Sequence, residues 1–564
     1  MKKKNIILAC TALALTYMTA CKKDFLDVNN VQANVSVDEL YSNYGYAQQV
    51  VWNAYSYLPN GLTDLDLEAA SDDAEETSVS DRSQQFNDGT WDQYTNLDDS
   101  WTRNFEGIQQ ANLFLKNRSR INIDYLRDRI TSTDSTAYFN ARDNVRFLSG
   151  EVYFLKAYFY FDLVRHYGGV PILTAPLDYN DKASWKSQTR SSVDECIKYI
   201  NALCDSAAAI IPVDMSAYSW YDLGRVTYGA IKALQSKVLL FAASPLFQEA
   251  GATQSWAQAA KAAHDVIALG SYQLDGNYAN LFGSGNTSSP EVIFYKRYGA
   301  INWLEEDNFP IVFQNANGKS LTPTQNFVDA FEVLTKDVNG AVTGSRPFSW
   351  SNPMDAKDPY TNRDPRLEAE VLYNEASFSG NTIETYTGGN SGLPKLNATK
   401  TGYYLKKWVN PSIDLVNGTT ANHAWIYFRY GGILLNYAES MLHAYGADAD
   451  PEGYGMTALE AINLVRARAG MPALSAAQLD EAAIEHERRV EMGFEGQRLW
   501  DVRRWKQGTT FNQPVNRMVI TKTGTTLDYS VKKLENRKFS DKMYWFPIPQ
   551  SEINKTGWTQ NAGW

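Results

Sequence analysis

The stretch RYGGILLNYAESMLHAYG (residues 429–446) is followed, after a short loop that contains Pro451 and Gly453, by ALEAINLVRARAG (residues 458–470). Apolar residues recur in both segments at the three- and four-residue steps of an amphipathic helix. Two helices of this length joined by a turn form one unit of a tetratricopeptide-like helical repeat. We therefore expect a mainly α-helical protein whose scaffold is built from such pairs.

The same helical pattern fills much of the first half of the chain. Within residues 144–173 it begins at the first residue and ends at Gly168-Gly169. It returns in residues 225–247 and 255–272. These segments leave room for about four helix pairs in all. Strand-like alternation is scarce, so only a few short strands are expected.

The character of the chain changes over residues 276–420, which are rich in Gly, Asn, Ser, Thr and aromatic residues. Irregular segments of this length inside an ordered protein are usually functional. We therefore expect this loop-rich part to hold the ligand. The predicted organisation is a signal segment over 1–20, a helical region over 21–275, and a C-terminal region over 276–564 with a helical repeat over 425–510.

The N-terminus has the features of an export signal. Lys2, Lys3 and Lys4 precede an apolar run that ends at Ala20 and is too short to span a bilayer as a retained helix. Cys21 follows directly and resembles the lipidated cysteine of a bacterial lipobox. We expect cleavage before Cys21 and a lipid anchor on its sulfur; the alternative is an ordinary signal with a chance cysteine.

Charge and composition narrow the classes of partner. The net charge is −11 at pH 7, and loss of the three signal lysines would leave a still more acidic chain, which argues against nucleic acid as a partner. With 34 Tyr and 15 Trp in a polar, exported chain, some aromatic side chains are expected to be exposed for binding. Cys196 and Cys204 lie about 12 Å apart along one expected helix, too far for a disulfide.

No motif for catalysis or metal binding is complete. The sequence GKS at 318–320 lacks the first glycine of a phosphate-binding loop, the five histidines never show HExxH spacing, and Leu459 stands where a calcium loop needs its closing carboxylate. We predict no metal, no cofactor and no catalytic residue. A glycosidase carboxylate pair stays open as an alternative, because 64 acidic residues offer many pairs that only geometry can distinguish.

The charged run EHERRVEMGFEGQRLWDVRRWKQG (residues 485–508) interleaves acidic and basic side chains. Arg488 and Glu491, like Arg498 and Asp501, are spaced as ion pairs on one helix face. This pattern favours a structural ion-pair lattice over a nucleic-acid-binding helix. Its packing anchors would be Phe494, Trp500 and Trp505.

Several stretches, in this order along the chain, carry a family resemblance: CKKDFLD after the lipobox, NRDPRL at 362–367, INLVRARAG at 462–470, RRVEMGFEGQRLWDVRRW at 488–505 and FPIPQSEINKTGWTQNAGW at the end. Together they resemble the SusD/RagB family of outer-membrane nutrient-binding lipoproteins of Bacteroidetes. The resemblance implies four tetratricopeptide-like helix pairs that support a loop-rich ligand-binding part. It also implies a lipid-anchored protein on the cell exterior that forms a lid over a SusC-like TonB-dependent transporter and captures oligosaccharide without cleaving it.

Sugar capture needs particular residue types, because a pyranose stacks its apolar C–H face on an aromatic ring while its hydroxyls bond to planar polar groups. Trp101 is assigned to the core because its surroundings are helical, whereas Trp91 is open to either role. The expected ligand contacts in loop-like sequence are the aromatic residues Trp91, Tyr295, Trp303 and Trp350 and the polar residues Asp72, Asp73, Asn96 and Arg297.

Two other functions stay open at this point. Some relatives on the RagB side of the family serve peptide uptake, and a peptide binder would need polar edges that satisfy backbone amides. A glycoside hydrolase is the alternative from a different class. The aromatic-rich loops favour sugar over peptide.

Overall fold

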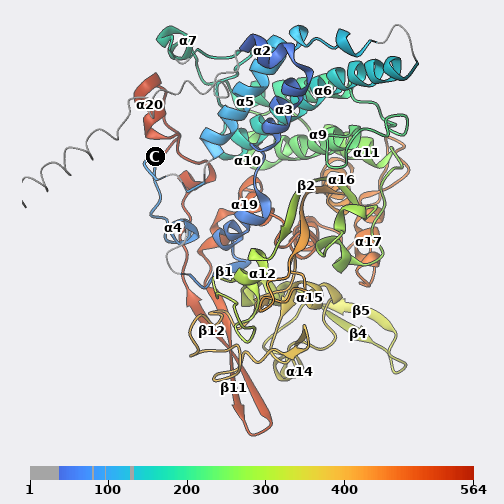
Figure 1. Ribbon diagram of the computed structural model, residues 1–564. Coiled ribbons are helices and arrows are strands. Elements are labelled where there is room, and N and C mark those ends of the chain that lie inside the picture. The colour runs from blue at the N-terminus through green and yellow to red at the C-terminus, as the bar shows by residue number, and fades with distance from the viewer. Residues whose placement is uncertain (1–36, 79–81, 96, 99, 128–131, 179) are drawn as a thin grey trace, which may run out of the picture. The chain divides into compact units, whose positions relative to one another are not determined.

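The computed structural model describes residues 37–564 apart from 79–81, 96, 99, 128–131 and 179. The expected signal segment 1–20, Cys21 and Asn96 therefore lie outside the described residues. α-Helices dominate the described chain (Figure 1): α2 (Val37–Ser42), α3 (Tyr44–Tyr55), α4 (Arg82–Asp88), α5 (Ser100–Asn117), α6 (Ser132–Tyr167), α7 (Lys182–Lys186), α8 (Val193–Ala208), α9 (Tyr228–Ala243), α10 (Pro245–Glu249), α11 (Trp256–Ile267), α12 (Trp303–Asn308), α13 (Gln325–Ala330), α14 (Pro353–Lys357), α15 (Pro365–Glu370), α16 (Tyr430–Tyr445), α17 (Ala458–Arg468), α18 (Glu481–Glu491), α19 (Arg498–Arg504) and α20 (Gln550–Thr556).

Close contacts divide the chain into two compact units, Met1–Val50 with Asn117–Val145 and Val51–Lys116 with Arg146–Trp564. In the described part of the first unit, Arg120 pairs with Asp38, and Asn144 donates a hydrogen bond of 2.7 Å to Tyr44. The second unit contains the long C-terminal half of α6 and all later elements. The division predicted from sequence, 21–275 and 276–564, remains a prediction.

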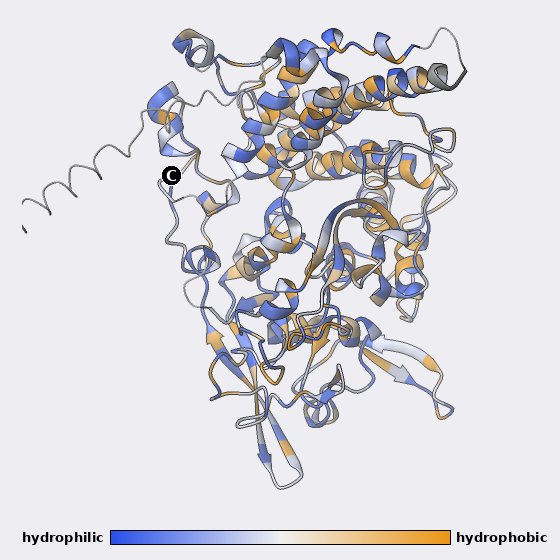
Figure 2. Cartoon of the chain, viewed as in Figure 1, coloured by the Kyte–Doolittle hydropathy of each residue, from blue (hydrophilic) through white to orange (hydrophobic). Residues whose placement is uncertain are grey.

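The second unit is built on helices that stack in chain order. Helix α8 packs on α9, α9 on α11, α11 on α16, and α16 on α17. Hydrophobic residues concentrate along these long helices, whereas the connecting loops are mostly hydrophilic (Figure 2). The mainly α-helical, tetratricopeptide-like fold predicted from residues 429–470 is thereby confirmed. On α8, Cys196 and Cys204 are both free and buried, as expected.

Helix ends follow from the local sequence. A capping box precedes each of the helices α8, α11 and α17, with Ser192, Ser255 and Thr457 as the respective N-cap residues. In each box the N-cap hydroxyl accepts a hydrogen bond from the backbone N–H three residues later. These caps satisfy backbone donors that would otherwise lack partners at the helix start. Among the described helices, none combines the length and the apolar character that crossing a membrane requires.

The described strands form two-stranded antiparallel sheets: β1 (Ala74–Glu76) with β3 (Leu321–Pro323), β2 (Val292–Ile301) with β10 (Ala421–Arg429), β4 (Val333–Lys336) with β5 (Val342–Arg346), β6 (Val371–Leu372) with β9 (Tyr404–Leu405), β7 (Ser377–Phe378) with β8 (Asn381–Thr382), and β11 (Val515–Thr523) with β12 (Thr526–Glu535). In the β2–β10 ribbon, Lys296 lies opposite Trp425 and Tyr295 opposite Ile426. Short 3₁₀ helices fill other connections: η2 (Gly61–Ala70), η3 (Arg118–Arg120), η4 (Asp124–Leu126), η5 (Tyr278–Phe282), η6 (Asn286–Ser288), η7 (Gly508–Asn512) and η8 (Asp541–Tyr544).

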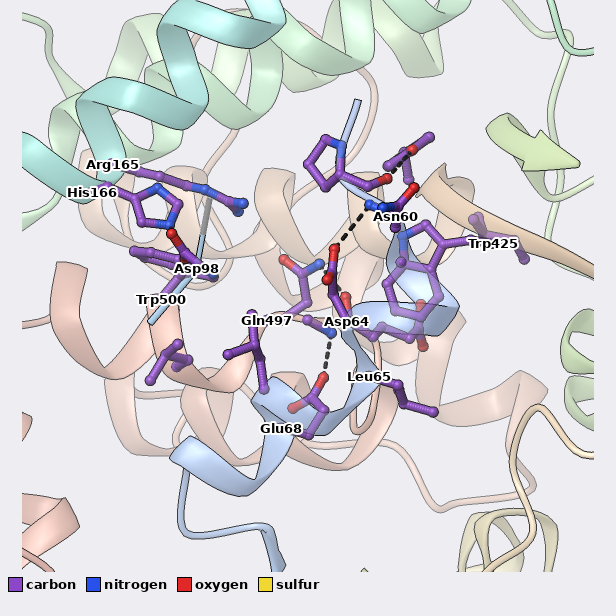
Figure 3. A pocket seen from close by; sticks show the side chains of 18 of the residues that line it. Asn60, Asp64, Leu65, Glu68, Asp98, Arg165, His166, Trp425, Gln497 and Trp500 are labelled. Carbon is purple, nitrogen blue, oxygen red and sulfur yellow. Dashed lines mark hydrogen bonds and ion pairs between the residues drawn. The ribbon is translucent and has the colours of Figure 1, made fainter. Parts of the chain in front are cut away.

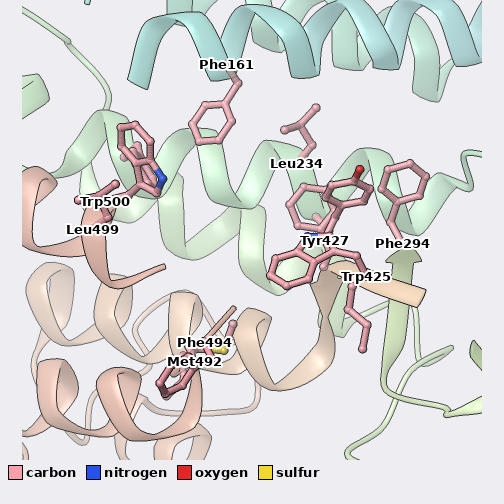
Figure 4. Close-up of a cluster of buried hydrophobic side chains, with 14 of the residues drawn as sticks. Phe161, Leu234, Phe294, Trp425, Tyr427, Met492, Phe494, Leu499 and Trp500 are labelled. Carbon is pink, nitrogen blue, oxygen red and sulfur yellow. The ribbon is translucent and has the colours of Figure 1, made fainter. Parts of the chain in front are cut away.

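One continuous apolar core joins the helices to the β2–β10 ribbon. Phe161 of α6, Leu234 of α9 and Phe294 of β2 are drawn toward the same interior as Trp425 and Tyr427 of β10 (Figure 4). The rings of Phe294 and Tyr427 stack with their centroids 5.3 Å apart. Burial of such large side chains stabilises each by roughly 1.5–3 kcal/mol. The ribbon is therefore fixed against the helical scaffold.

A central ion-pair network connects the loop-rich part to the repeat helices. Arg429, at the end of β10, contacts Glu491 and Glu291 at 2.6 and 2.7 Å and Glu495 at 2.8 Å. Arg366 and Lys407 reach the same acidic side chains from the loop-rich part. The side chains of this network are at most 4% exposed: Glu291, Asp364, Arg366, Glu370, Lys407, Arg429, Arg466, Arg468, Glu487, Glu491 and Glu495.

The lattice predicted over residues 485–508 is confirmed in kind, but its partners are different. Arg488 pairs with Asp501 and not with Glu491, and Arg498 pairs with Asp72. Glu491 is buried and is contacted by guanidinium groups from other elements, because a buried carboxylate needs more neutralisation than a neighbour on its own helix supplies. Phe494, Trp500 and Trp505 are buried, as expected of the packing anchors.

Candidate functional site

A polar cavity of about 240 Å³ lies between η2, the end of α6, strand β10 and the segment before α19 (Figure 3). Its walls carry unusually many ionisable groups for so small a space. Among them are Asp64, Glu68, Arg82, Asp98, His166 and Lys237. Charged groups directed into one cavity mark a candidate functional site.

The cavity wall depends on one glycine and two tryptophans. Gly61 has φ +63°, and a Cβ at this position would lie 2.2 Å from Cγ of Trp425, so only glycine lets η2 approach the indole. On its other side, Trp425 stacks on Trp408 with ring centroids 4.8 Å apart. The Trp408 indole N–H donates to the carbonyl of Phe494 at 2.7 Å. The aromatic wall of the cavity is therefore rigid.

The inner end of the cavity is closed by a buried hydrogen-bond chain. His166 contacts the Asp98 carboxylate through Nε2 at 2.9 Å and the Asp162 carbonyl through Nδ1 at 2.6 Å. Burial alone would raise the pKa of Asp98, but His166 outweighs burial and holds that pKa well below its usual range. Lys237 donates to Gln497 at 3.0 Å, and burial lowers the pKa of Lys237 to about 7.

Glu68 is a buried carboxyl group of this wall. Burial raises its pKa to about 8, although its carboxylate accepts a hydrogen bond from the backbone N–H of Gly496. The folded protein therefore binds a proton that the unfolded chain releases above its ordinary pKa of 4.5. This contribution to stability is fully present below that ordinary pKa and is lost as the pH rises toward 8.

Glu68→Gln should therefore gain stability relative to the wild type as the pH rises. Between about pH 5 and pH 9 we expect the difference in free energy of unfolding to change in favour of the variant by roughly 2 kcal/mol or more, since one pKa unit corresponds to about 1.4 kcal/mol. Urea unfolding of both proteins across this range measures the difference. Parallel pH curves would show that Glu68 does not take up the proton.

The outer end of the cavity is held by an arginine between two carboxylates. Arg82 binds Asp66 through two nitrogens, both at 2.8 Å, and reaches Asp64 at 3.3 Å. Asp64 also accepts from the backbone N–H of Asn60 at 2.9 Å. The side chains of Arg82, Asp64 and Asp66 are between 21 and 28% exposed, so these fixed planar groups are within reach of a ligand.

Strand β2 extends this polar end with aromatic side chains. Lys296 donates to the Asn60 side-chain oxygen at 2.5 Å and lies 5.8 Å from the Tyr298 ring centroid. The Tyr298 ring meets the Trp303 ring edge-on, with centroids 6.5 Å apart. We call the resulting array, Asn60, Asp64, Arg82, Lys296, Tyr298 and Trp303, the Asp64–Trp303 surface.

Of the predicted contacts that the structure describes, only Trp303 lies at this surface. Tyr295 and Arg297 are on the opposite face of β2. There, both side chains lie next to Gly224. Trp350 belongs to another part of the loop-rich region, where its indole N–H donates to Asp329 at 3.1 Å. The aromatic residues predicted to contact ligand therefore do not form one site.

Three predicted contacts are buried, and this corrects the expectation for them. Trp91 is 2% exposed, packed with ring centroids 4.5 Å from Trp564 and 4.9 Å from Phe546, so it is a core residue. Asp72 pairs with Arg498 at 2.9 Å, and Asp73 pairs with Arg489 at 2.6 Å. Their carboxylates join η2 to α18 and α19 and face away from solvent.

Trp101 and Asn96 are the two other residues near Trp91 for which the sequence predicts a role. Trp101 is 6% exposed and packs edge-on against Tyr167 with centroids 4.9 Å apart, which confirms its assignment to the core. Asn96 lies outside the described residues, so its predicted contact stays a prediction.

No local pattern in the sequence points to Asn60, Asp64 and Arg82, because each stands in ordinary polar surroundings and they come together only on folding. Lys296 and Tyr298 could have been predicted, because they alternate with the predicted contacts Tyr295 and Arg297 along one strand. Side chains of a strand alternate between its two faces. A correct assignment of the face would have found both residues.

Two family models match the chain in separate parts. The model described as the SusD family matches residues 290–564, and the model described as starch-binding associating with outer membrane, of SusD-like type, matches residues 24–240. The chain belongs to the SusD family. The residues that line the cavity beside Asp64 fall within both matches: those of η2 and α6 within 24–240, and those of β10 and α19 within 290–564.

Individual SusD relatives agree with this assignment. A SusD-like protein of Formosa agariphila is 24% identical over 396 residues, which are 65% of this chain and 68% of the relative. A solved SusD-like protein of Bacteroides fragilis superposes with a TM-score of 0.75 at 26% identity, covering 94% of this chain and 100% of that one. A SusD-like carbohydrate binding protein, also of Bacteroides fragilis, superposes with a TM-score of 0.72 at 23% identity, covering 92% and 99%.

Proposed function

We propose that the chain is a non-catalytic, cell-surface glycan-binding lipoprotein of the outer membrane. In this proposal it captures oligosaccharide and delivers it to a SusC-like TonB-dependent transporter. The observation that carries the proposal is the Asp64–Trp303 surface. There, half-buried aromatic rings lie next to carboxylate and guanidinium groups that are already fixed by one another.

The chemistry of this surface suits a sugar. A pyranose can place its apolar face on Trp303 or Tyr298, while its hydroxyls bond to the carboxylates of Asp64 and Asp66 and to Arg82. Because these groups are held before ligand arrives, little side-chain entropy is lost on binding. The names of the matched family model and of a solved relative, starch-binding and carbohydrate binding, support the same ligand class.

Affinity electrophoresis of the purified protein in gels that contain soluble starch, laminarin, xylan or levan tests the proposal. We expect at least one polysaccharide to retard migration relative to a non-binding reference protein. The same polysaccharides incubated with the protein should release no new reducing ends, because the proposed role is capture. Release of reducing ends would instead favour a glycoside hydrolase.

The proposed lipid anchor is attached to Cys21. Cys21→Ala should move the protein from the membrane fraction to the soluble fraction, because the proposed acyl chains supply about 0.8 kcal/mol per buried methylene and the described helices supply no span. The melting temperature should be unchanged. Fractionation followed by immunoblotting measures the effect, and a variant that stays in the membrane fraction would argue against lipidation at Cys21.

A further inference from the structure

A second cavity, of about 480 Å³, lies between α5, the residues 171–177, helix α7 with Gln188, and α20. It shares no lining residue with the cavity beside Asp64. Four aromatic side chains line it: Trp101, Phe105, Trp185 and Trp558. The rings of Trp101 and Phe105 are 4.8 Å apart, and those of Trp101 and Trp558 are 6.2 Å apart.

A second hollow adjoins this cavity. A hollow of about 300 Å³ shares Trp101, Thr102 and Glu552 with it and extends to Tyr94, whose side chain is 75% exposed. Helices α7 and α20 are in contact and form one wall. We call the combined feature, from Tyr94 to Trp185, the Trp185 groove. Two adjoining hollows offer room for an extended chain of several units.

Trp185 has no evident part in stabilising the fold. Its side chain is half-buried on the five-residue helix α7 and does not pack against the apolar core. Within the described chain its ring meets no other aromatic ring, and its indole N–H has no acceptor. By contrast, Trp558 donates its indole N–H to the carbonyl of Gln188 at 2.8 Å. A tryptophan with a free face and a free donor at a groove is suited to ligand contact.

The polar groups of the groove favour an uncharged, hydroxyl-rich ligand. Lys555 is neutralised by Glu552 at 2.7 Å. Glu106, exposed beside Phe105, forms no hydrogen bond or ion pair with the side chains or backbone that the structure describes, so its carboxylate can accept hydroxyl groups. One free carboxylate and several aromatic faces match a sugar chain and would repel an anionic ligand.

A peptide is a poorer match to the same walls. An extended peptide needs backbone or amide groups with which to pair its own amides. The Gln109 side chain and the Leu177 backbone are already paired with each other, through hydrogen bonds of 2.8 and 2.9 Å. The groove wall therefore offers aromatic faces where a peptide would need unpaired amides.

We propose that the Trp185 groove is a second glycan-binding site, in which Trp185 stacks on a pyranose ring and Glu106 accepts its hydroxyls. This inference rests on the proposed glycan-binding function. Two sites on one rigid protein that engage the same polysaccharide raise its apparent affinity by making the second contact intramolecular. The groove would thus strengthen the hold on long chains beyond what the Asp64–Trp303 surface provides alone.

Hydroxyl-radical footprinting with mass spectrometry, in the presence and absence of soluble starch, laminarin, xylan and levan, tests the groove directly. We expect the polysaccharide that binds the wild type to reduce oxidation of Trp185 by at least half. Affinity electrophoresis then compares Trp185→Ala, Trp303→Ala and the double variant, with Trp256→Ala, whose ring stacks on His443 elsewhere, as the matched control. Trp185→Ala should weaken retention by roughly tenfold, and the double variant should lose it.

The outcomes separate the two proposals. Protection of Trp303 without protection of Trp185, together with unchanged retention of Trp185→Ala, would overturn the groove and leave the proposed function standing. Protection of Trp185 by a tryptic casein digest but by none of the polysaccharides would overturn its assignment to glycan. If no polysaccharide retards the wild type or protects either tryptophan, the proposed function fails and the groove proposal fails with it.

Discussion

Arg429→Met is expected to lower the free energy of unfolding by about 3–5 kcal/mol, the range measured when one partner of a buried ion pair is removed. Arg429 is almost completely buried and contacts Glu291, Glu491 and Glu495 together. Methionine fills much of the same volume but leaves these carboxylates with fewer cationic partners. The cost arises because a buried charge without neutralisation is strongly unfavourable.

The effect should also depend on pH. Burial alone would raise the pKa of Glu491, but Arg468, Arg429 and Arg366 outweigh burial and hold it well below its usual range. In the wild type this depressed pKa contributes stability that is present at neutral pH and is lost as the pH falls through the folded-state pKa. Removal of one guanidinium should reduce that contribution, so the variant should lose less stability than the wild type on acidification.

Urea unfolding followed by circular dichroism measures the loss, with Arg120→Met as the matched control. Arg120 pairs with Asp38 at the surface, where its side chain is 51% exposed, so this variant should change stability by less than about 1 kcal/mol. Equal effects of the two substitutions would show that the central ion-pair network does not hold the loop-rich part to the repeats.

Trp303→Ala is expected to weaken glycan binding by roughly 30-fold, which corresponds to about 2 kcal/mol at 1.4 kcal/mol per tenfold. The indole belongs to the Asp64–Trp303 surface and meets the Tyr298 ring edge-on. Its ring is half-buried and packs against the apolar core on one side, and the exposed part is available to a pyranose. The fold should be retained, with some fall in melting temperature because part of the ring packs on the core.

Trp350→Ala provides the matched comparison for this experiment. Trp350 is also a half-buried tryptophan of the loop-rich part, but its indole is bonded to Asp329 and its ring packs on Phe348 with centroids 5.1 Å apart. Calorimetric titration should show weakened binding for Trp303→Ala and wild-type affinity for Trp350→Ala. The reverse order would move the glycan site to the Trp350 region.

The helical scaffold was accessible from sequence because its determinants are local. The period of apolar residues in 429–446 and 458–470 and the capping residues Ser192 and Thr457 act within a few positions. Family resemblance gave the arrangement of these helices, which local pattern alone would not have fixed.

The site was less accessible because it depends on contacts between distant segments. Asp72 and Asp73 look like loop carboxylates in the sequence, yet arginines more than 400 positions later bury them in ion pairs. Trp91 is covered by Phe546 and Trp564 from the end of the chain. On β2, the predicted residues Tyr295 and Arg297 were one position away from Lys296 and Tyr298, and a shift of one residue exchanges the faces of a strand.

Isothermal titration calorimetry of the purified protein with soluble starch, laminarin, xylan and levan, and separately with a tryptic casein digest, tests the central claim most directly. Glycan capture at the Asp64–Trp303 surface predicts saturable heat with at least one polysaccharide, weakened by Trp303→Ala, and none with the peptides. Saturable binding of the peptides with no heat from any polysaccharide would contradict it.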